Sequence, residues 1–266
     1  MQAKINDSKI YYVEGGNPAA ASVIFIHGFP FSSEIWKSQL EALGHDYHAV
    51  AYDFRGLGKS ALGDGQYTLE GHVDDLIALL DFLEIDKAVV VGLSMGGYIA
   101  LRALERNPER FLGVALCDTQ SKADDNAGKL KRAAGAKAVK KDGAAAFAQG
   151  FVGAVFTPAS IENKVPEVDF IQDIISANDP VAIAGNLIAM AARTDTTESL
   201  ADIAVPTLIL VGEEDKLTPP DAARDMHNRI KGSQLHLVPQ AAHMSNLENP
   251  AFFNARLLEF LSTIEE

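Results

Sequence analysis

Ser94 stands where a serine could act as a nucleophile. It is the central residue of Gly-Leu-Ser-Met-Gly, residues 92–96, between an apolar run at 88–91 and an apolar helical pattern that begins at Tyr98. A serine at a sharp strand-to-helix turn, with a glycine two positions before and after it, forms a nucleophile elbow. The glycines give the turn room, because a Cβ on either one would collide with the neighbouring strand or helix. The turn would expose the hydroxyl at a helix N-terminus, where backbone N–H groups can stabilise an oxyanion.

A serine nucleophile needs an adjacent base, which is usually a histidine oriented by a carboxylate. In a parallel sheet the ligand site lies beyond the carboxyl ends of the strands, so we look for these partners in loops that follow strands. His243 lies in the loop after the last predicted strand, residues 234–239, and is our candidate base. His27 also follows a strand, but Gly28 and Pro30 beside it indicate a ring that holds a tight turn.

The other five of the seven histidines have less suitable positions. His72 and His227 fall inside predicted helices, and we expect them on the solvated faces. His236 alternates within a predicted strand. His45 and His48 flank the beginning of a strand, at the end opposite to the expected site, so none of the five is a candidate base.

Asp215 is our candidate for the carboxylate that orients the histidine. It follows the predicted strand 206–212, and the Thr-Pro-Pro turn at 218–220 fixes the loop around it. Asp118 also follows a strand and stays the alternative acid. The order along the chain is then serine, aspartate, histidine.

Two backbone amides are candidates for the oxyanion hole, which needs converging N–H donors. One is the amide of Met95, directly after Ser94. The other should come from the loop after an earlier strand, and the amide of Phe29 in His-Gly-Phe-Pro, residues 27–30, is the best candidate.

The composition limits the class of protein. The chain has 266 residues, of which 47% are hydrophobic, enough for a large core in one α/β domain. The net charge of −13 disfavours nucleic acid and anionic membrane surfaces as partners. The single cysteine, Cys117, permits no internal disulfide and no cysteine-rich metal site. There is no apolar signal-peptide core and no run near about 18 apolar residues, so we expect a cytoplasmic protein.

The apolar patterns place these residues on alternating strands and helices. Strands are predicted for a hairpin within 3–13 and for the runs 22–26, 48–52, 88–91, 111–116, 206–212 and 234–239. Helices are predicted after a cap at Ser33, after Thr68, from Tyr98, at 221–230 and at 247–261. Such alternation indicates a parallel sheet with right-handed crossovers.

The alternation breaks between residues 119 and 195. Alanine- and lysine-rich stretches there predict helices at 129–141, 143–156 and 180–192. Because this segment greatly exceeds one crossover, we interpret it as a helical cap insertion. The predicted organisation is a core in two parts, residues 1–118 and 196–266, with the cap 119–195 between them. Ordinary crossover helices without a gating role are the alternative.

A set of motifs occurs in order along the chain: residues 27–30, Asp-Phe-Arg-Gly-Leu-Gly-Lys-Ser (53–60), Gly-Leu-Ser-Met-Gly-Gly (92–97), Gly-Glu-Glu-Asp (212–215) and His-Met-Ser-Asn (243–246). With this set the sequence resembles the α/β-hydrolase fold superfamily over nearly its whole length, and it looks like 3-oxoadipate enol-lactonase-like hydrolases and small carboxylesterases. The resemblance implies an α/β-hydrolase fold with a mostly parallel eight-stranded sheet flanked by helices. It also implies a catalytic triad of Ser94, Asp215 and His243.

The resemblance further implies a serine hydrolase that cleaves a small carboxylic ester or lactone through an acyl-enzyme. It implies a small-molecule substrate, no metal and no organic cofactor, and it leaves the oligomeric state open. Haloalkane dehalogenases and epoxide hydrolases are excluded, because they carry Asp where this chain has Ser94. One alternative is a cofactor-free perhydrolase or haloperoxidase, although these usually carry Trp at the position of Phe29. Another is a ligand receptor that uses the same pocket without turnover.

Apolar residues of the oxyanion loop and the cap predict the wall of the substrate pocket: Phe29, Phe147, Phe151 and Met190. The cap residues among them could instead pack the cap against the core. An enol-lactone that carries a carboxylate would need a cation in this pocket. The candidates for it are Arg132, Lys137 and Arg193.

Overall fold

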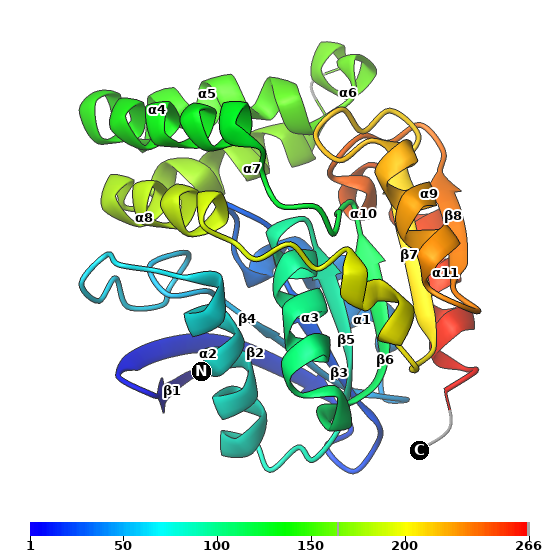
Figure 1. The fold of residues 1–266 in the computed structure, drawn as a ribbon. Helices are drawn as coiled ribbons and strands as arrows, with labels where there is room; N and C mark the ends of the chain where they lie inside the picture. Colours follow the sequence, from blue (N-terminus) through cyan, green and yellow to red (C-terminus); the bar gives the residue numbers. More distant parts are fainter. Residues whose placement is uncertain (164, 265–266) are drawn as a thin grey trace.

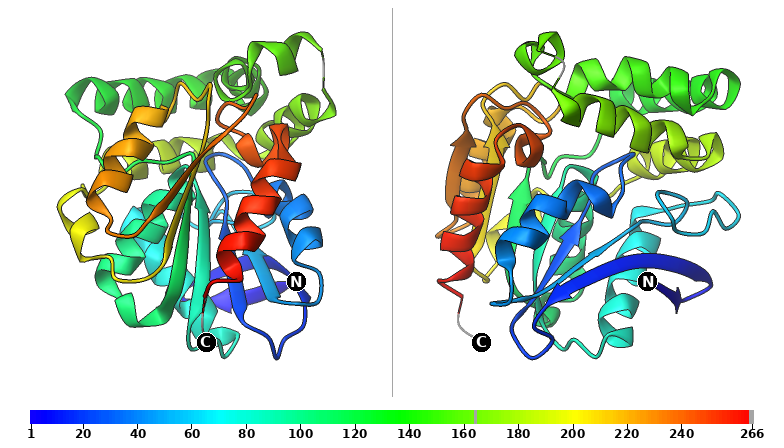
Figure 2. Two further views of the ribbon diagram at one scale, coloured as in Figure 1. Left: turned by 90° about the vertical axis from the view of Figure 1, so that its right-hand side faces the viewer. Right: turned by 180° about the vertical axis from the view of Figure 1, so that it is seen from behind.

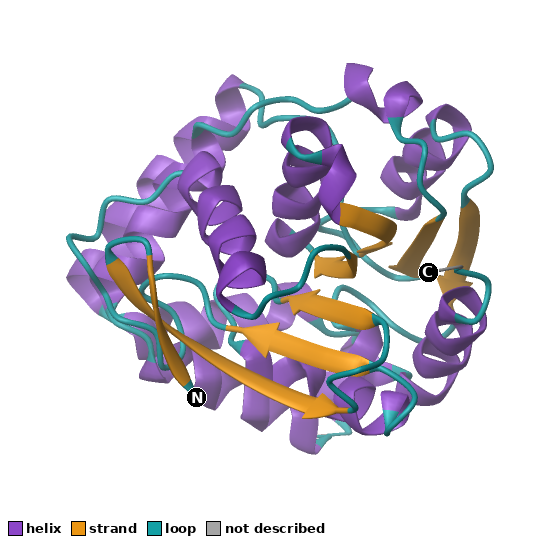
Figure 3. Cartoon of the chain, turned by 90° about the horizontal axis from the view of Figure 1, so that it is seen from below, coloured by secondary structure: helices purple, strands orange, loops and turns teal. Residues whose placement is uncertain are grey.

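One sheet forms the centre of the molecule. The computed structural model describes residues 1–163 and 165–264. Its strands are β1 (Gln2–Ile5), β2 (Ser8–Gly16), β3 (Ser22–Ile26), β4 (His48–Tyr52), β5 (Ala88–Leu93), β6 (Phe111–Cys117), β7 (Thr207–Gly212) and β8 (Gln234–Val238). They form an eight-stranded sheet in the order β1-β2-β4-β3-β5-β6-β7-β8 (Figures 1 and 3). Only β2 pairs antiparallel, with β1 and β4, so the predicted mostly parallel eight-stranded sheet is confirmed.

Burial explains why the apolar runs are strands. Every residue of β3, β4, β5 and β7 is buried, as expected for strands with helices on both faces. One face carries α2 (Leu69–Phe82), α3 (Met95–Arg106) and α9 (Pro220–Arg229), which lie in front in Figure 1. The other face carries α1 (Lys37–Leu43) and α11 (Pro250–Leu261), seen from behind in Figure 2. The carboxyl ends of the parallel strands therefore meet at one edge, where the candidate residues were expected.

Between β6 and β7 the described residues form helices and no strand. The cap helices are α4 (Asn126–Asp142), α5 (Ala144–Val155), α6 (Pro158–Glu162), α7 (Pro166–Ala177) and α8 (Pro180–Ala191), and the 3₁₀ turn η3 (Glu198–Asp202) follows them. They lie across the carboxyl ends of the strands, with α4 packed on α8 and α5 on α7 (Figures 1 and 2). The helices predicted at 129–141, 143–156 and 180–192 are confirmed as α4, α5 and α8. The division at 119–195 into core and cap stays an interpretation, and its last part, 196–266, ends two residues beyond the described chain.

Two local predictions are wrong. The helix after β3 is capped by Ser32 instead of Ser33, because the Ser32 hydroxyl accepts the Glu34 N–H; the helix begins as the 3₁₀ turn η1 (Ser33–Trp36) before α1. The terminal helix predicted over 247–261 is two helices, α10 (Ser245–Glu248) and α11. Asn249 separates them because its side chain caps α11, whose first residue is a proline.

Within the described residues, no single helix is long and apolar enough to cross a membrane. The helices α7 and α8 reach that length and composition only together, and they bend by 97° at the break between them.

Candidate active site

Ser94 lies at the turn between β5 and α3, as the motif predicts. Its backbone has φ 55° and ψ −113°, a region that a residue with a Cβ rarely adopts. A Cβ on Gly92 would lie 2.5 Å from the carbonyl oxygen of Gly96, and one on Gly96 would lie 2.2 Å from that of Ile26. The predicted steric need for both glycines is therefore confirmed.

The structure brings His243 and Asp215 together from the loops after β8 and β7. The Nδ1 atom of His243 lies 2.8 Å from Oδ2 of Asp215. Asp215 also accepts hydrogen bonds from the Thr218 hydroxyl at 2.7 Å and from the amides of Leu217 and Thr218 at 2.8 and 3.1 Å. Both residues are buried, and several donors fix the carboxylate of Asp215. Because Nδ1 of His243 is bonded to Asp215, Nε2 is the ring nitrogen available to exchange a proton.

Burial and the neighbouring charges shift the pKa values of His243 and Asp215 in opposite directions. Burial disfavours the imidazolium of His243, but the charge and hydrogen bond of Asp215 and the nearby Asp118 outweigh it and raise the pKa of His243. Burial likewise disfavours the Asp215 carboxylate, yet His243 and Thr218 hold the pKa of Asp215 below its ordinary value. The pair is thus suited to a protonated imidazole beside an ionised carboxylate.

Asp118, the alternative acid, has other partners. Its Oδ1 accepts the Gly212 N–H at 2.8 Å, and its Oδ2 accepts the hydroxyl of Ser245. Asp118 is fully buried, and burial together with the charge of Asp215 raises its pKa well above the ordinary value. Asp215 therefore makes the hydrogen bond to His243. Asp118 instead connects the end of β7 at Gly212 with Ser245 in the segment after His243.

The loop at 27–30 lies against Ser94. A Cβ on Gly28 would be 3.2 Å from the Ser94 Cβ. Neither the Phe29 amide nor the Met95 amide donates a hydrogen bond to any residue in the described part of the chain. Both N–H groups thus remain available to an oxyanion, and their role stays a prediction.

The His27 ring holds this loop, as expected. Its Nε2 accepts a hydrogen bond from the amide of Phe54 at 3.1 Å, so its Nδ1 is the donor to the Gly28 carbonyl at 2.7 Å.

The prediction that His72 is solvated is wrong. His72 on α2 is buried, and its Nε2 lies 2.8 Å from Oδ1 of Asn186 on α8. The helical pattern of α2 could not show this, because the cap helix α8 covers that face.

A cavity of about 760 Å³ lies between the cap helices and the strand ends. Ser94 and His243 both line it. The four predicted wall residues line it as well: Phe29, Phe147, Phe151 and Met190. The rings of Phe147 and Phe151 stack at 5.3 Å, and Phe29 meets each of them edge-on. Whether these side chains contact a substrate stays a prediction.

The cavity also has charged residues on its wall. Arg132, Lys131 and Asp124 line it, whereas Lys137 is exposed on α4 and does not. Lys131 was missed, although Gly128, Lys131, Gly135 and Ala138 recur at helical spacing and form the face of α4 that lines the cavity. Asp124 pairs with Arg132 and, at 2.6 Å, with Arg193.

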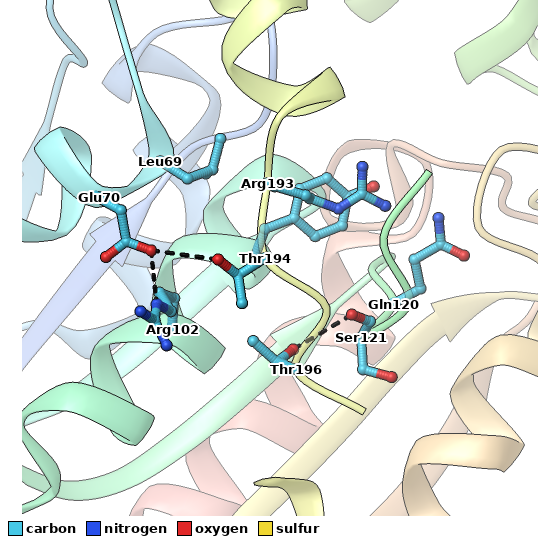
Figure 4. Close-up of a pocket in the computed structure, with 9 residues that line it drawn as sticks. Leu69, Glu70, Arg102, Gln120, Ser121, Arg193, Thr194 and Thr196 are labelled. Atoms are coloured by element: carbon cyan, nitrogen blue, oxygen red, sulfur yellow. Dashed lines mark hydrogen bonds and ion pairs between the residues drawn. The ribbon is translucent and has the colours of Figure 1, made fainter. Parts of the chain in front are cut away.

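Arg193 belongs to the connection between cap and core. We call residues 119–125 and 192–197 the neck. There the Thr196 amide donates to the Ser121 carbonyl at 3.2 Å, and the guanidinium of Arg193 lies 4.2 Å from the centre of the Tyr98 ring on α3. Figure 4 shows the neck beside α2 and α3, where Glu70 bonds Arg102 and Thr194. Arg193 therefore lies behind the cavity wall and joins the neck to the core.

Within the described residues, no group of three or more His, Cys, Asp or Glu side chains could hold a metal ion. The expectation of a reaction without metal or organic cofactor stays a prediction.

Comparison with known proteins places this geometry in context. A family model described as alpha/beta hydrolase fold matches residues 21–250. The chain is 29% identical over 248 residues to 3-oxoadipate enol-lactonase 2 of Acinetobacter baylyi, covering 93% of this chain and 91% of that protein.

Solved structures are similar over the full length. A thermophilic esterase from Thermogutta terrifontis, solved with malate bound, has a TM-score of 0.96 and 29% identity, with 100% of both chains covered. A bromoperoxidase from Bacillus anthracis has a TM-score of 0.87 and 27% identity, with 98% of this chain and 99% of that chain covered. The similarity therefore extends through the cap helices as well as the sheet.

Proposed function

The chain belongs to the alpha/beta hydrolase fold family, and within it we propose a serine hydrolase that cleaves a small carboxylic ester or lactone. The observation that carries the proposal is that Ser94 and the hydrogen-bonded pair of His243 and Asp215 meet at one cavity. Residues from the ends of β5, β7 and β8 converge there, although they are far apart in sequence.

The proposed reaction has two steps. The Oγ of Ser94 attacks the carbonyl carbon while Nε2 of His243 takes the hydroxyl proton. The C–O bond of the ester then breaks, and His243 returns the proton to the leaving oxygen. Water then attacks the acyl carbon and gives a proton to His243; the bond from that carbon to Oγ of Ser94 breaks, His243 returns the proton to Oγ, and the carboxylic acid is released. In a lactone the leaving oxygen stays attached, so the product is an open hydroxy acid.

The surrounding groups stabilise charge as it develops. Asp215 keeps the proton of neutral His243 on Nδ1 and stabilises the imidazolium. The amides of Phe29 and Met95 are the proposed donors to the oxyanion, a type of contact worth about 3–4 kcal/mol per donor in other enzymes.

The cavity wall supports a substrate that carries a carboxylate. Lys131 and Arg132 contribute two positive charges against one negative charge from Asp124, in a protein whose net charge is −13. The aromatic rings at the other side suit an apolar part of the same molecule. An anionic ester or enol-lactone, as the name of the Acinetobacter baylyi relative suggests, fits both features.

The test is the Ser94→Ala variant. We expect it to lower kcat for a short-chain p-nitrophenyl ester at least about 10³-fold and to abolish labelling by a fluorophosphonate probe. Ser176→Ala, at a half-buried position of α7 where the hydroxyl bonds only the Gln172 carbonyl, is the matched control and should behave as wild type. Unchanged turnover in Ser94→Ala would refute the proposal, and a chain that binds esters but never labels would be a receptor.

A perhydrolase is the second candidate, favoured by the likeness to the Bacillus anthracis bromoperoxidase. In that reaction hydrogen peroxide replaces water in attacking the acyl-enzyme, which yields a peracid that oxidises halide. Peroxide-dependent bromination in the presence of acetate, at a rate above ester hydrolysis, would favour it over the hydrolase.

A further inference from the structure

We propose that Glu248 is a positioning residue that couples the cap helices to the loop that carries His243. The proposal rests on the proposed function of His243 as the base. Glu248 is the last residue of α10, five positions after His243 in the chain, and it does not line the cavity.

The carboxylate of Glu248 bridges two parts of the molecule. Its Oε2 accepts the Ala242 amide at 2.6 Å, directly before His243. Its Oε1 accepts the amide of Thr157 at 2.9 Å and the hydroxyl of Ser160 at 2.6 Å. Thr157 is the N-cap of α6 and Ser160 lies within it, so one oxygen faces the histidine loop and the other faces the cap.

A second contact holds the other side of His243. The amide of Met244 donates to the carbonyl of Val155, the last residue of α5, at 3.1 Å. Both chain neighbours of His243 therefore have their N–H groups fixed by the cap or by a carboxylate bound to it. A displacement of α5 and α6 would be transmitted to the histidine backbone.

The core holds the same loop from its opposite side. The amide of Glu214 donates to the Ala241 carbonyl at 2.9 Å, and the hydroxyl of Ser245 donates to Asp118. The loop thus lies between fixed core acceptors and donors on one side and the cap on the other. Both the cap and the core therefore fix the position of this loop.

The substitution Glu248→Gln breaks the link between the histidine loop and the cap with little change in side-chain shape. A carboxylate accepts at both oxygens, whereas an amide accepts at one and donates at the other. Glutamine can therefore satisfy the Ala242 amide or the Thr157 amide, but not both. We expect kcat to fall about tenfold to a hundredfold with KM changed less than about threefold, because a small misplacement of a base costs that much.

Two further variants distinguish a loss of the link between cap and histidine loop from the loss of a negative charge and from misfolding. Glu214→Gln removes a carboxylate near the same loop whose side chain makes no hydrogen bond within the described chain, and it should keep wild-type kcat. Ser160→Ala keeps Glu248 and its charge but removes one cap contact, and we expect a fall in kcat of about threefold. If Glu248→Gln does not fold, kcat and the His243 resonance of Ser160→Ala test the proposal.

The state of His243 can be read without turnover, from the downfield NMR resonance of its Nδ1 proton bonded to Asp215. We expect this resonance to shift or broaden in Glu248→Gln and Ser160→Ala and to be unchanged in Glu214→Gln. Wild-type kcat with an unchanged resonance in Glu248→Gln, or in Ser160→Ala if only that variant folds, overturns the proposal. Full activity in Ser94→Ala would instead refute the proposed function, and the resonance alone would then decide the coupling.

Discussion

At the scale of single residues, the protonation of His243 decides when the site can work. Burial lowers its pKa, but Asp215 and Asp118 more than compensate, so the pKa lies above the ordinary value of 6.5. A base must be neutral to accept the serine proton. Activity should therefore appear only as the pH rises through this raised pKa.

The pH profile of kcat/KM tests this directly. We expect its acidic limb to have a midpoint above pH 6.5 for a neutral ester. Asp215→Asn should move the midpoint down and lower kcat by about 10⁴-fold, because the amide no longer favours the required tautomer. A wild-type midpoint below pH 6.5 would contradict the raised pKa of His243.

The charged residues on the cavity wall predict substrate preference. Arg132→Gln should lower kcat/KM for the hemisuccinate ester of p-nitrophenol about fivefold relative to the butyrate ester, since a partly exposed ion pair contributes about 1 kcal/mol. Lys137→Gln, on the same helix but away from the cavity, is the matched control. An unchanged ratio of the two esters in Arg132→Gln would exclude this arginine from substrate recognition.

The candidate site could be located from sequence because its residues sit at strand ends. A parallel sheet brings the ends of distant strands to one edge, so Asp215 and His243 could be paired without knowing any distance. The partners of His72 and Arg193 could not be predicted in this way. Both contact residues across the boundary between cap and core, and no periodicity within one helix records what covers it.

At the scale of elements, α2 and α8 are joined by a buried histidine. The His72 ring packs 5.0 Å from the Phe54 ring and bonds Asn186 on α8. Burial lowers the pKa of His72 to about 4, against an opposing effect of Asn186 and Asp75. Burial therefore keeps the imidazole of His72 neutral at neutral pH, although the hydrogen bond to Asn186 alone would favour the protonated ring.

This contact predicts a loss of stability in acid. The unfolded chain binds a proton at His72 near pH 6.5 and the folded chain only near 4, so the free energy of unfolding falls as the pH drops through that window. We expect His72 to account for about 2 kcal/mol of the loss between pH 7 and 5. Urea unfolding should show a shallower pH dependence for His72→Gln than for wild type. The exposed His45→Gln should match wild type, and equal slopes in all three proteins would contradict the prediction.

The cap helices show where pattern reading succeeds and fails. The helices α4, α5 and α8 were predicted from alanine-rich composition, a property of each segment alone. The helix α7 has Val168, Ile171 and Ile175 buried at helical spacing, so a periodicity search would have found it. The sequence analysis did not predict α7, because it relied on alanine-rich composition and not on the spacing of apolar residues.

At the scale of the whole molecule, the cap helices are attached to the core at several separate places, and three of these attachments depend on charged or ionisable side chains. His72 joins α8 to α2, Glu248 joins α6 to the histidine loop, and Arg193 joins the neck to α3. The cavity lies among these attachments. Because each lies on a different side, the cap should unfold together with the sheet in the wild-type protein.

Arg193 is the attachment whose loss should break this cooperativity. Its buried guanidinium bonds Asp124 and the Lys122 carbonyl, so Arg193→Ala leaves the partly buried Asp124 carboxylate with Arg132 alone and should lower the free energy of unfolding by about 2 kcal/mol. Hydrogen exchange should rise in α4 to α8 while β5 and β6 stay protected, because the remaining attachments do not hold the neck. Arg224→Ala, which breaks an exposed pair with Asp221, should change stability by less than about 0.5 kcal/mol. Uniform exchange through cap and sheet in Arg193→Ala would mean that the other attachments suffice to keep the molecule one cooperative unit.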